Sequence, residues 1–260
     1  MSETTEKKEL NKPEKAYKNL DFLNSRDARA LRILAEYLHP KAQFMSQGLQ
    51  NTIVVFGSAR APAPEEAEQI KATNPNDPRL KLTSYYEQTV ELTNRLTQWS
   101  LGLDAEEQPF VVCTGAGPGV MMAANRGAHE AGGKNVGLAI SLPNESVANP
   151  YVTPELHFEF HYFFTRKFWF AYFAKALIIM PGGFGTLDEL FEILTLIQTK
   201  KIKRTLPIVL FGKEFWNKLI NFETLVEFGT ISPEDLNLFH LSDQVEDAFQ
   251  FITSNLKVDT

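Results

Sequence analysis

Short apolar runs alternate with longer amphipathic segments along most of the chain. Six runs rich in apolar and β-branched residues predict strands at residues 52–56, 110–113, 136–140, 157–163, 176–180 and 207–211. Most of these runs are apolar throughout, as in strands buried on both faces with helices as crossovers. The pattern predicts an α/β fold: a Rossmann-like open, mainly parallel sheet with helices on both faces.

Helical spacing fills the intervals between these strands. It predicts helices at residues 84–99, 120–131, 165–174, 187–199, 214–226 and 244–256, with a short helical piece at 65–70. A further helix precedes the first strand, because Leu31, Leu34, Ala35 and Leu38 share one helical face. We expect Ser25 to cap this helix and His39-Pro40 to end it.

The domain organisation is also expected from the pattern. Residues 1–20 are polar and charged, which predicts a mobile tail. Residues 21–260 are expected to form one domain, with the N-terminal helix and an exposed insertion at 61–83, which is rich in Pro, Glu, Asn and Lys.

Composition narrows the class of protein. The formal charge of -6 offers no basic footprint for nucleic acid. A single cysteine, Cys113, rules out an internal disulfide framework and favours a reducing compartment. The N-terminal residues lack the apolar core of a signal peptide, and the apolar stretch at 168–180 is too short to cross a bilayer. We therefore expect a cytoplasmic protein that binds neither membrane nor nucleic acid.

Two glycine-rich turns each join a strand to a helix. The first contains Gly115, Gly117 and Gly119, and the second contains Gly182, Gly183, Gly185 and Thr186. Glycine lets the backbone approach a ligand, and the start of the next helix favours phosphate. The alternative interpretation is a pair of tight turns without a ligand. Neither turn matches the dinucleotide fingerprint, and a P-loop is lacking.

Charged residues stand next to the second turn. Asp188, Glu189 and Glu192 crowd the start of the following helix, where carboxylates interact favourably with the helix dipole. Glu189 and Glu192 are three residues apart, so they share a face that could act on a substrate. Upstream, Arg166 and Lys167 form either a solvated surface pair or a clamp for an anion.

The histidines and the cysteine give weaker indications of function. The pair His157 and His161 lacks a cysteine or carboxylate that would complete a usual metal set, so no metal site is expected. Cys113 ends an apolar strand and is expected in the core.

The string PGGFGTLDE, residues 181–189, resembles the PGGxGTxxE signature of the Lonely guy (LOG) family. Members of that family were long mislabelled lysine decarboxylases. Arg166-Lys167 matches the Arg-Lys pair that precedes the family signature. The turn from Gly115 to Met121 and the pair Gly57-Ser58 also match family patterns. The resemblance spans roughly residues 25–255.

The resemblance implies a function and a set of site residues. LOG enzymes are phosphoribohydrolases that cut nucleoside 5′-monophosphates, including cytokinin ribotides, into free base and ribose 5-phosphate, without a metal or organic cofactor. It makes Arg166 and Glu189 the catalytic pair. Further substrate contacts are implied at these positions: Ser58, Gly115, Gly117, Gly119, Glu145, Lys167, Gly182, Gly183, Gly185, Thr186, Asp188, Glu192 and Thr195.

Departures from the short plant-type members leave the identity of the substrate's base undetermined. The added N-terminal helix, the longer 61–83 segment and the residues before Arg166 are more similar to the longer bacterial branch. AMP is the default substrate, and a homodimer or higher homo-oligomer is expected from the family. Two alternatives remain: a non-catalytic nucleotide or cofactor carrier on the same fold, and a decarboxylase using Lys167 or Lys175 as a Schiff-base lysine.

Overall fold

The computed structural model of the chain describes residues 13–103, 109–141 and 149–256. Its strands form one seven-stranded sheet: β1 (Thr52–Phe56), β2 (Val111–Thr114), β3 (Asn135–Ile140), β4 (His157–Phe160), β5 (Ala174–Ile179), β6 (Ile208–Phe211) and β7 (His240–Ser242). The α-helices are α1 (Leu20–Asn24), α2 (Arg29–Ser46), α3 (Pro64–Thr73), α4 (Thr83–Leu101), α5 (Val120–Glu130), α6 (Phe163–Phe173), α7 (Phe184–Gln198), α8 (Lys213–Leu219), α9 (Phe222–Glu227) and α10 (Val245–Asn255). Four short 3-10 helices are η1 (Ala16–Lys18), η2 (Pro78–Leu82), η3 (Pro154–Leu156) and η4 (Pro233–Leu238).

All strand pairs are parallel, and the order is β4-β3-β2-β1-β5-β6-β7. The chain therefore builds outward from β1 to β4, then returns to the other side of β1 and builds outward again from β5 to β7. The direction reverses between β1 and β5. In open α/β sheets this switch point, at the carboxyl ends of the strands, is where ligands bind. The predicted fold class is confirmed.

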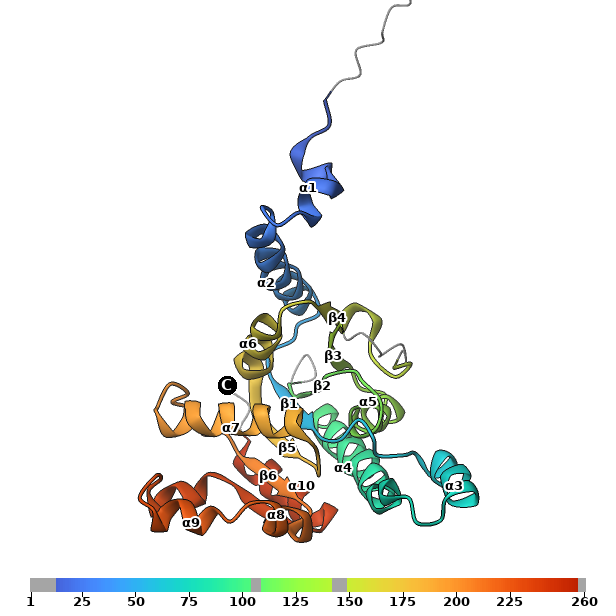
Figure 1. Cartoon of the computed structure of the whole chain (residues 1–260), viewed down its shortest axis with the longest axis vertical. Helices are drawn as coiled ribbons and strands as arrows, with labels where there is room; N and C mark the ends of the chain where they lie inside the picture. Colours follow the sequence, from blue (N-terminus) through green and yellow to red (C-terminus); the bar gives the residue numbers. More distant parts are fainter. Residues whose placement is uncertain (1–12, 104–108, 142–148, 257–260) are drawn as a thin grey trace, which may run out of the picture.

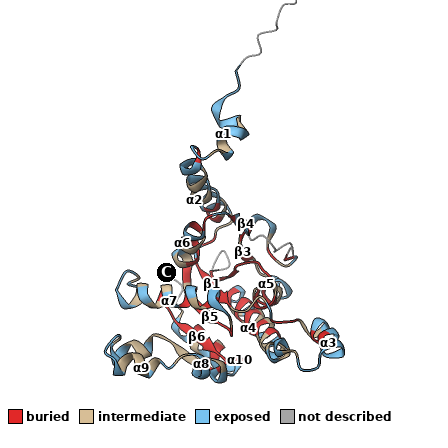
Figure 2. Cartoon of the chain, in the orientation of Figure 1, coloured by how far each residue is buried: buried red, intermediate tan, exposed pale blue. Residues whose placement is uncertain are grey.

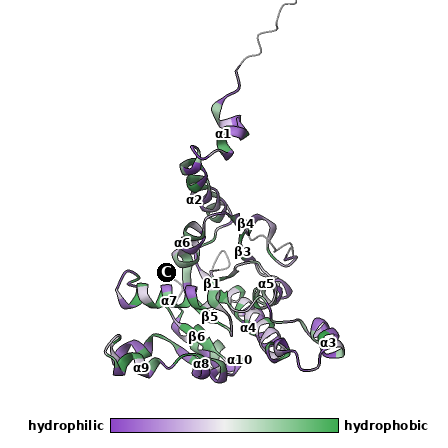
Figure 3. Ribbon diagram, in the orientation of Figure 1, coloured by the Kyte–Doolittle hydropathy of each residue, from purple (hydrophilic) through white to green (hydrophobic). Residues whose placement is uncertain are grey.

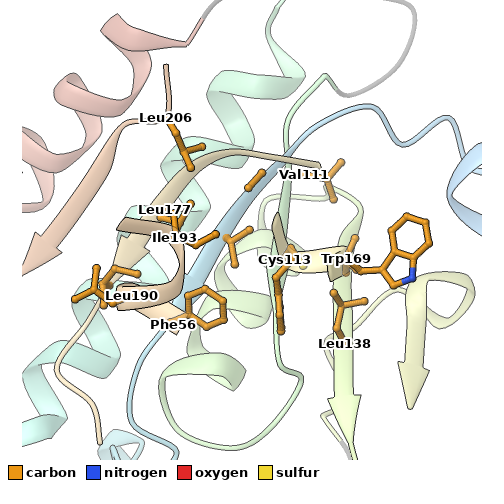
Figure 4. Packing of buried hydrophobic residues seen from close by; sticks show 14 of the residues in the cluster. Phe56, Val111, Cys113, Leu138, Trp169, Leu177, Leu190, Ile193 and Leu206 are labelled. Atoms are coloured by element: carbon orange, nitrogen blue, oxygen red, sulfur yellow. The ribbon is translucent and has the colours of Figure 1, made fainter. Parts of the chain in front are cut away.

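Two hydrophobic layers cover the two faces of the sheet. Alternate strand residues such as Val54 and Leu177 pack with α2, α6 and α7, whereas Ile53 and Ile178 pack with α4, α5 and α10. Figure 4 shows the first layer, in which Phe56 and Cys113 from the sheet meet residues of the covering helices. Figure 2 shows the strands as buried and α1 and α3 as largely exposed.

The N-terminal helix, α2, begins and ends at residues other than those predicted. It begins after Ala28 rather than at Ser25, which instead ends α1, and it continues through a buried Pro40. A proline inside a helix costs about 3 kcal/mol. Phe44, one turn beyond, is almost fully buried and packs edge-on against Phe158 and Trp169, which offsets that cost. Figure 1 shows α1 and the start of α2 projecting from the rest of the chain.

Several further elements differ from the sequence prediction. The strand expected at 157–163 ends at Phe160, and helix α6 begins at Phe163. The expected helix at 214–226 is broken into α8 and α9, because Asn221 caps α9 by accepting a hydrogen bond from the amide of Thr224. The three-residue strand β7 was not predicted. Helix α7 begins at Phe184, three residues before the expected start, so Gly185 and Thr186 lie in its first turn. The insertion carries α3 and η2, with the predicted helical piece inside α3.

None of the described helices has the length and apolar character needed to cross a membrane. Figure 3 shows polar and apolar residues interleaved along α2, α4 and α7.

Candidate active site at the strand ends

The second glycine turn, which follows β5, leaves open space beside two of its glycines. A Cβ atom added at Gly183 or Gly185 would meet no atom within 4 Å, whereas one at Gly182 would lie 2.1 Å from Thr186 Oγ1. Among the described side chains none caps the start of α7. The first amide N–H groups of a helix have no partner within the helix, so this turn presents donors and partial positive charge. It fits an anion such as phosphate.

The first glycine turn is filled by the protein itself. Added Cβ atoms at Gly115 and Gly117 would lie 2.8 and 2.6 Å from the side chain of Met121. At Gly119, whose φ is +65°, the added atom would lie 2.4 Å from the Ser58 carbonyl oxygen. Tight packing therefore accounts for these three glycines by itself.

Ser58 links the two turns. Its amide donates to the Pro181 carbonyl at 3.0 Å, and its carbonyl accepts from the amide of Val120, also at 3.0 Å. These bonds tie the end of β1 to the turn after β5 and to the start of α5. Ser58 therefore lies beside both glycine turns.

Arg166 and Glu189 face each other beside this junction. The Arg166 Nη2 atom lies 3.8 Å from Glu189 Oε1, with 14% and 6% of the two side chains exposed. The guanidinium also lies over the rings of Phe163 and Phe170. Helix α6 supplies the arginine and the first turns of α7 supply the glutamate, so the structure brings the predicted catalytic pair together.

Burial raises the pKa of Glu189 to about 7. The positive charges of Lys167 and Arg166 act in the opposite direction, and the carboxylates of Glu192 and Asp188 add to the rise. A carboxyl group with a pKa near neutrality can accept or donate a proton under physiological conditions. Such a shift in a partly enclosed position is typical of a functional site, although structural ion pairs also produce it.

Lys167 joins the two outer carboxylates. Its Nζ atom lies 2.7 Å from Asp188 Oδ2 and 2.7 Å from Glu192 Oε2. Burial lowers the Lys167 pKa, but the hydrogen bonds that its ammonium donates to Asp188 and Glu192 outweigh burial, and the net pKa is raised. Lys167 therefore holds α6 to α7 as a charged ammonium.

Of the remaining predicted site residues, Thr195 lies at the surface and Glu145 lies outside the residues that the structure describes. Thr195 is exposed, and its hydroxyl donates to the Phe191 carbonyl. With Asp188, Glu192 and Phe184, it borders a largely apolar surface hollow of about 430 Å³. Glu145 lies outside the described residues.

Cys113 is buried in the core, as predicted, and burial raises the pKa of its thiol. In the part of the chain that the structure describes, no group of three or more His, Cys, Asp or Glu side chains could hold a metal ion.

Two polar groups near the site, the buried Asn125 and the partly buried Glu36, were missed by the sequence analysis. Asn125 on α5 accepts from Thr114 Oγ1 at 2.6 Å, and that hydroxyl accepts from the amide of Ala116 in the first turn. Glu36 on α2 accepts from residues at and just before the start of α6. Neither residue stands in a sequence motif. The partners of Glu36 lie far along the chain, and those of Asn125 hold a turn whose shape is not predicted.

Comparisons with known proteins agree with this geometry. The family model described as possible lysine decarboxylase matches residues 121–252, about half of the chain. Cytokinin riboside 5′-monophosphate phosphoribohydrolase LOG3 of Arabidopsis thaliana is 29% identical over 161 residues, which cover 59% of this chain and 67% of that protein. LOG7 of the same plant is 27% identical over 161 residues. The matches span about two thirds of the length of these relatives.

Two solved structures match the chain at lower identity, and the first of them shares the fold. An X-ray structure determined as a structural genomics target is 20% identical, with a TM-score of 0.51, and covers 78% of this chain and 99% of that one. The Moco carrier protein of Chlamydomonas reinhardtii is also 20% identical, with a TM-score of 0.47, over 80% of this chain and 99% of its own.

Three observations indicate the same family: the family model, the curated relatives and the PGGFGTLDE string at the start of α7. The chain belongs to the possible lysine decarboxylase family, which is the LOG family.

Proposed function

We propose that this protein hydrolyses the N-glycosidic bond of a nucleoside 5′-monophosphate, releasing free base and ribose 5-phosphate. The observation that carries the proposal is Glu189, a buried carboxyl with a pKa of about 7, placed one turn after an open glycine turn and 3.8 Å from Arg166. The names of the curated relatives support a phosphoribohydrolase.

In this proposal the second turn binds the 5′-phosphate. Gly183 and Gly185 leave room for it, and the uncapped start of α7 supplies amide donors and partial positive charge. The ribose then lies over the first turns of α7, near Asp188. Fixing the phosphate places the anomeric carbon close to the Glu189 carboxylate.

Breaking the bond between C1′ and the base nitrogen builds positive charge on the ribose ring. The Glu189 carboxylate stabilises that charge, and it orients and deprotonates the water that attacks C1′. The electrons of the broken bond leave with the base, which takes up a proton. Arg166 is an electrostatic and positioning group, because a guanidinium of pKa above about 12 is a poor proton donor.

We take AMP as the default substrate and test cytokinin ribotides beside it. The curated relatives are named for cytokinin riboside 5′-monophosphates, at 27–29% identity. The apolar hollow bordered by Phe184 and Phe191 on α7 offers a surface for an apolar substituent on the base.

Pyridoxal phosphate, which a lysine decarboxylase would use, does not fit these residues. A Schiff-base lysine must lose its proton to react. Lys167 is instead held as an ammonium by Asp188 and Glu192. Lys175 stands at the amino end of β5, opposite the glycine turn. We derive no decarboxylation step.

We also propose that the protein is a cytoplasmic homodimer or higher homo-oligomer. On α6, Phe164 and Tyr172 are 55% and 54% exposed, and on α2 Leu31, Leu34 and Leu38 are about half exposed. Large apolar side chains gathered on one surface are typical of protein interfaces. Sedimentation velocity of the full chain tests this assembly.

The activity is tested by measuring base release from AMP, GMP, CMP, UMP and an N6-prenyl AMP. We expect wild-type protein to release base and Glu189→Gln to lose about 100-fold or more of that rate. Glu246→Gln, at an exposed residue on α10, is the control and keeps the wild-type rate.

Binding of AMP without release by the wild type would favour a different function. It would overturn the hydrolase proposal and favour a carrier or sensor, in which Glu189 forms a structural ion pair with Arg166.

A further inference from the structure

Glu36, near the middle of α2, accepts hydrogen bonds from the two residues that precede α6 and from the first turn of that helix. Its Oε1 accepts from the amide of His161 at 2.8 Å, and its Oε2 accepts from the amide of Tyr162 at 3.3 Å. The Thr165 hydroxyl donates to the same Oε2 at 2.6 Å. One carboxylate therefore holds three donors that lie about 125 residues away in the chain.

Helix α6 has no cap of its own. Its N-cap residue is Tyr162, which makes no side-chain capping bond, and its first turn contains no acidic residue. A carboxylate at a helix N-terminus satisfies orphan amides and interacts favourably with the helix dipole. Hydrogen bonds to an ionised acceptor are also stronger than neutral ones. Glu36 thus supplies from another helix what the sequence before α6 lacks.

Packing around Glu36 fixes its position. The Trp169 Nε1 atom donates to the Glu36 backbone carbonyl at 3.2 Å, and the ring of Tyr37 stacks on Trp169 with centroids 5.4 Å apart. Phe44 packs edge-on against the same tryptophan. Helices α2 and α6 therefore contact one another through the aromatic rings around Trp169 and through the Glu36 carboxylate.

Arg166 directly follows the residue that Glu36 holds. The Arg166 amide bonds to the Tyr162 carbonyl in the same first turn, and its guanidinium lies 3.8 Å from Glu189. A change in the angle or depth of this turn therefore moves the guanidinium relative to the glutamate.

We infer that Glu36 is a positioning residue for the proposed reaction: by capping α6 across the α2–α6 contact, it places Arg166 against Glu189. The inference rests on the proposed function for its kinetic test. It gives the added N-terminal helix a role in the site.

The experiment compares Glu36→Gln and Glu36→Ala with wild type in the full chain, using AMP. A misplaced catalytic group typically costs catalysis on the order of 10- to 100-fold, so we expect kcat to fall about tenfold in Glu36→Gln and further in Glu36→Ala. KM should change by less than about threefold, because the phosphate turn is untouched.

A matched control lies one turn earlier on the same helix. The Arg32 guanidinium donates to the Leu23 and Ser25 carbonyls and so ties α1 to α2. Arg32→Ala should disturb the N-terminal helices but leave kcat at the wild-type value. An equal fall in kcat for Arg32→Ala and Glu36→Gln would overturn the positioning role in favour of general stability.

The pH profile gives a readout that a purely structural role would not move. Glu189 faces Arg166 and Lys167 from α6, and Asp188 and Glu192 from its own helix. When Arg166 moves away from Glu189, less positive charge opposes the rise in the Glu189 pKa. The acid limb of kcat/KM therefore shifts to higher pH in Glu36→Gln. An unchanged limb with unchanged kcat would overturn the inference.

Failure of the proposed function has a different signature. If wild-type protein releases no base from any nucleotide, the hydrolase proposal fails, and Glu36 is judged on amide hydrogen exchange at residues 161–166. The capping role of Glu36 then stands if Glu36→Gln speeds exchange in that segment while Arg32→Ala does not. It is overturned if exchange in Glu36→Gln matches wild type.

Discussion

The two glycine-rich turns are similar in sequence but differ in what occupies the space beside them. After β2, the side chain of Met121 covers Gly115 and Gly117, and the Ser58 carbonyl lies against Gly119. After β5, open space faces Gly183 and Gly185 at an uncapped helix start. The same residue type therefore serves packing in the first turn and leaves room for a ligand in the second.

The difference extends to the polar groups behind each turn. Thr114 and Asn125 hold the first turn through buried hydrogen bonds between neutral groups. Behind the second turn lie a buried carboxyl with a raised pKa and two cations. Neutral, satisfied groups stabilise a fold, whereas a buried carboxylate costs stability and is kept where chemistry needs it.

Adding one methyl group to the first turn should have the largest effect on folding. Gly119→Ala places a Cβ atom 2.4 Å from a backbone oxygen, at a φ of +65°. We expect a loss of about 3 kcal/mol or more in the free energy of unfolding, measured by urea denaturation. Gly117→Ala is the matched control: its clash is with the flexible end of Met121, so the loss should stay below about 1 kcal/mol. Equal losses would contradict the role of the backbone at Gly119.

The buried carboxyl behind the second turn should make stability depend on pH. The pKa of Glu189 is raised from 4.5 to about 7 in the folded state, so its favourable contribution is complete below pH 4.5 and is lost as pH rises to about 7. This loss amounts to about 3 kcal/mol. Glu189→Gln should therefore gain stability relative to wild type between pH 5 and pH 8. A stability difference that stays constant across this range would show that Glu189 does not titrate there.

The same methyl group in the second turn should affect binding instead of folding. Gly185→Ala adds a Cβ atom that meets no protein atom within 4 Å, so the free energy of unfolding should change by less than about 0.5 kcal/mol. We expect the Kd for AMP, measured by calorimetry, to rise about tenfold, since the added atom occupies the phosphate position. Unchanged affinity would mean that phosphate binds elsewhere.

Much of the fold could be predicted from local pattern. The first strand was predicted with its observed bounds, and most other strands and helices within a few residues, because periodicity depends only on neighbours along the chain. The errors have two different causes. Helix α2 continues through Pro40 because Phe44 packs on distant aromatic residues from β4 and α6. The predicted 214–226 helix breaks at Asn221 through a local signal that the prediction missed, the cap that Asn221 provides to Thr224 in α9.

The candidate site divides in the same way. The residues of PGGFGTLDE and the pair Arg166-Lys167 were identified from the sequence, because each group is contiguous in the chain. The sequence left open which glycine turn has room for a ligand and which of the three carboxylates beside the second turn is buried. Met121 settles the first question and the packing of α6 against α7 settles the second.

The sequence by itself determined the α/β class, the succession of six of the seven strands, and the motif at the start of α7. Only the tertiary structure decided that Glu189 is buried beside Arg166, that Met121 fills the first turn, and that Glu36 caps α6. Periodicity and motifs record the local pattern of residue types, not their packing. Burial and the raised pKa that follows from it depend on how α6, α7 and the sheet pack together. The cap on α6 depends on a residue more than a hundred positions away.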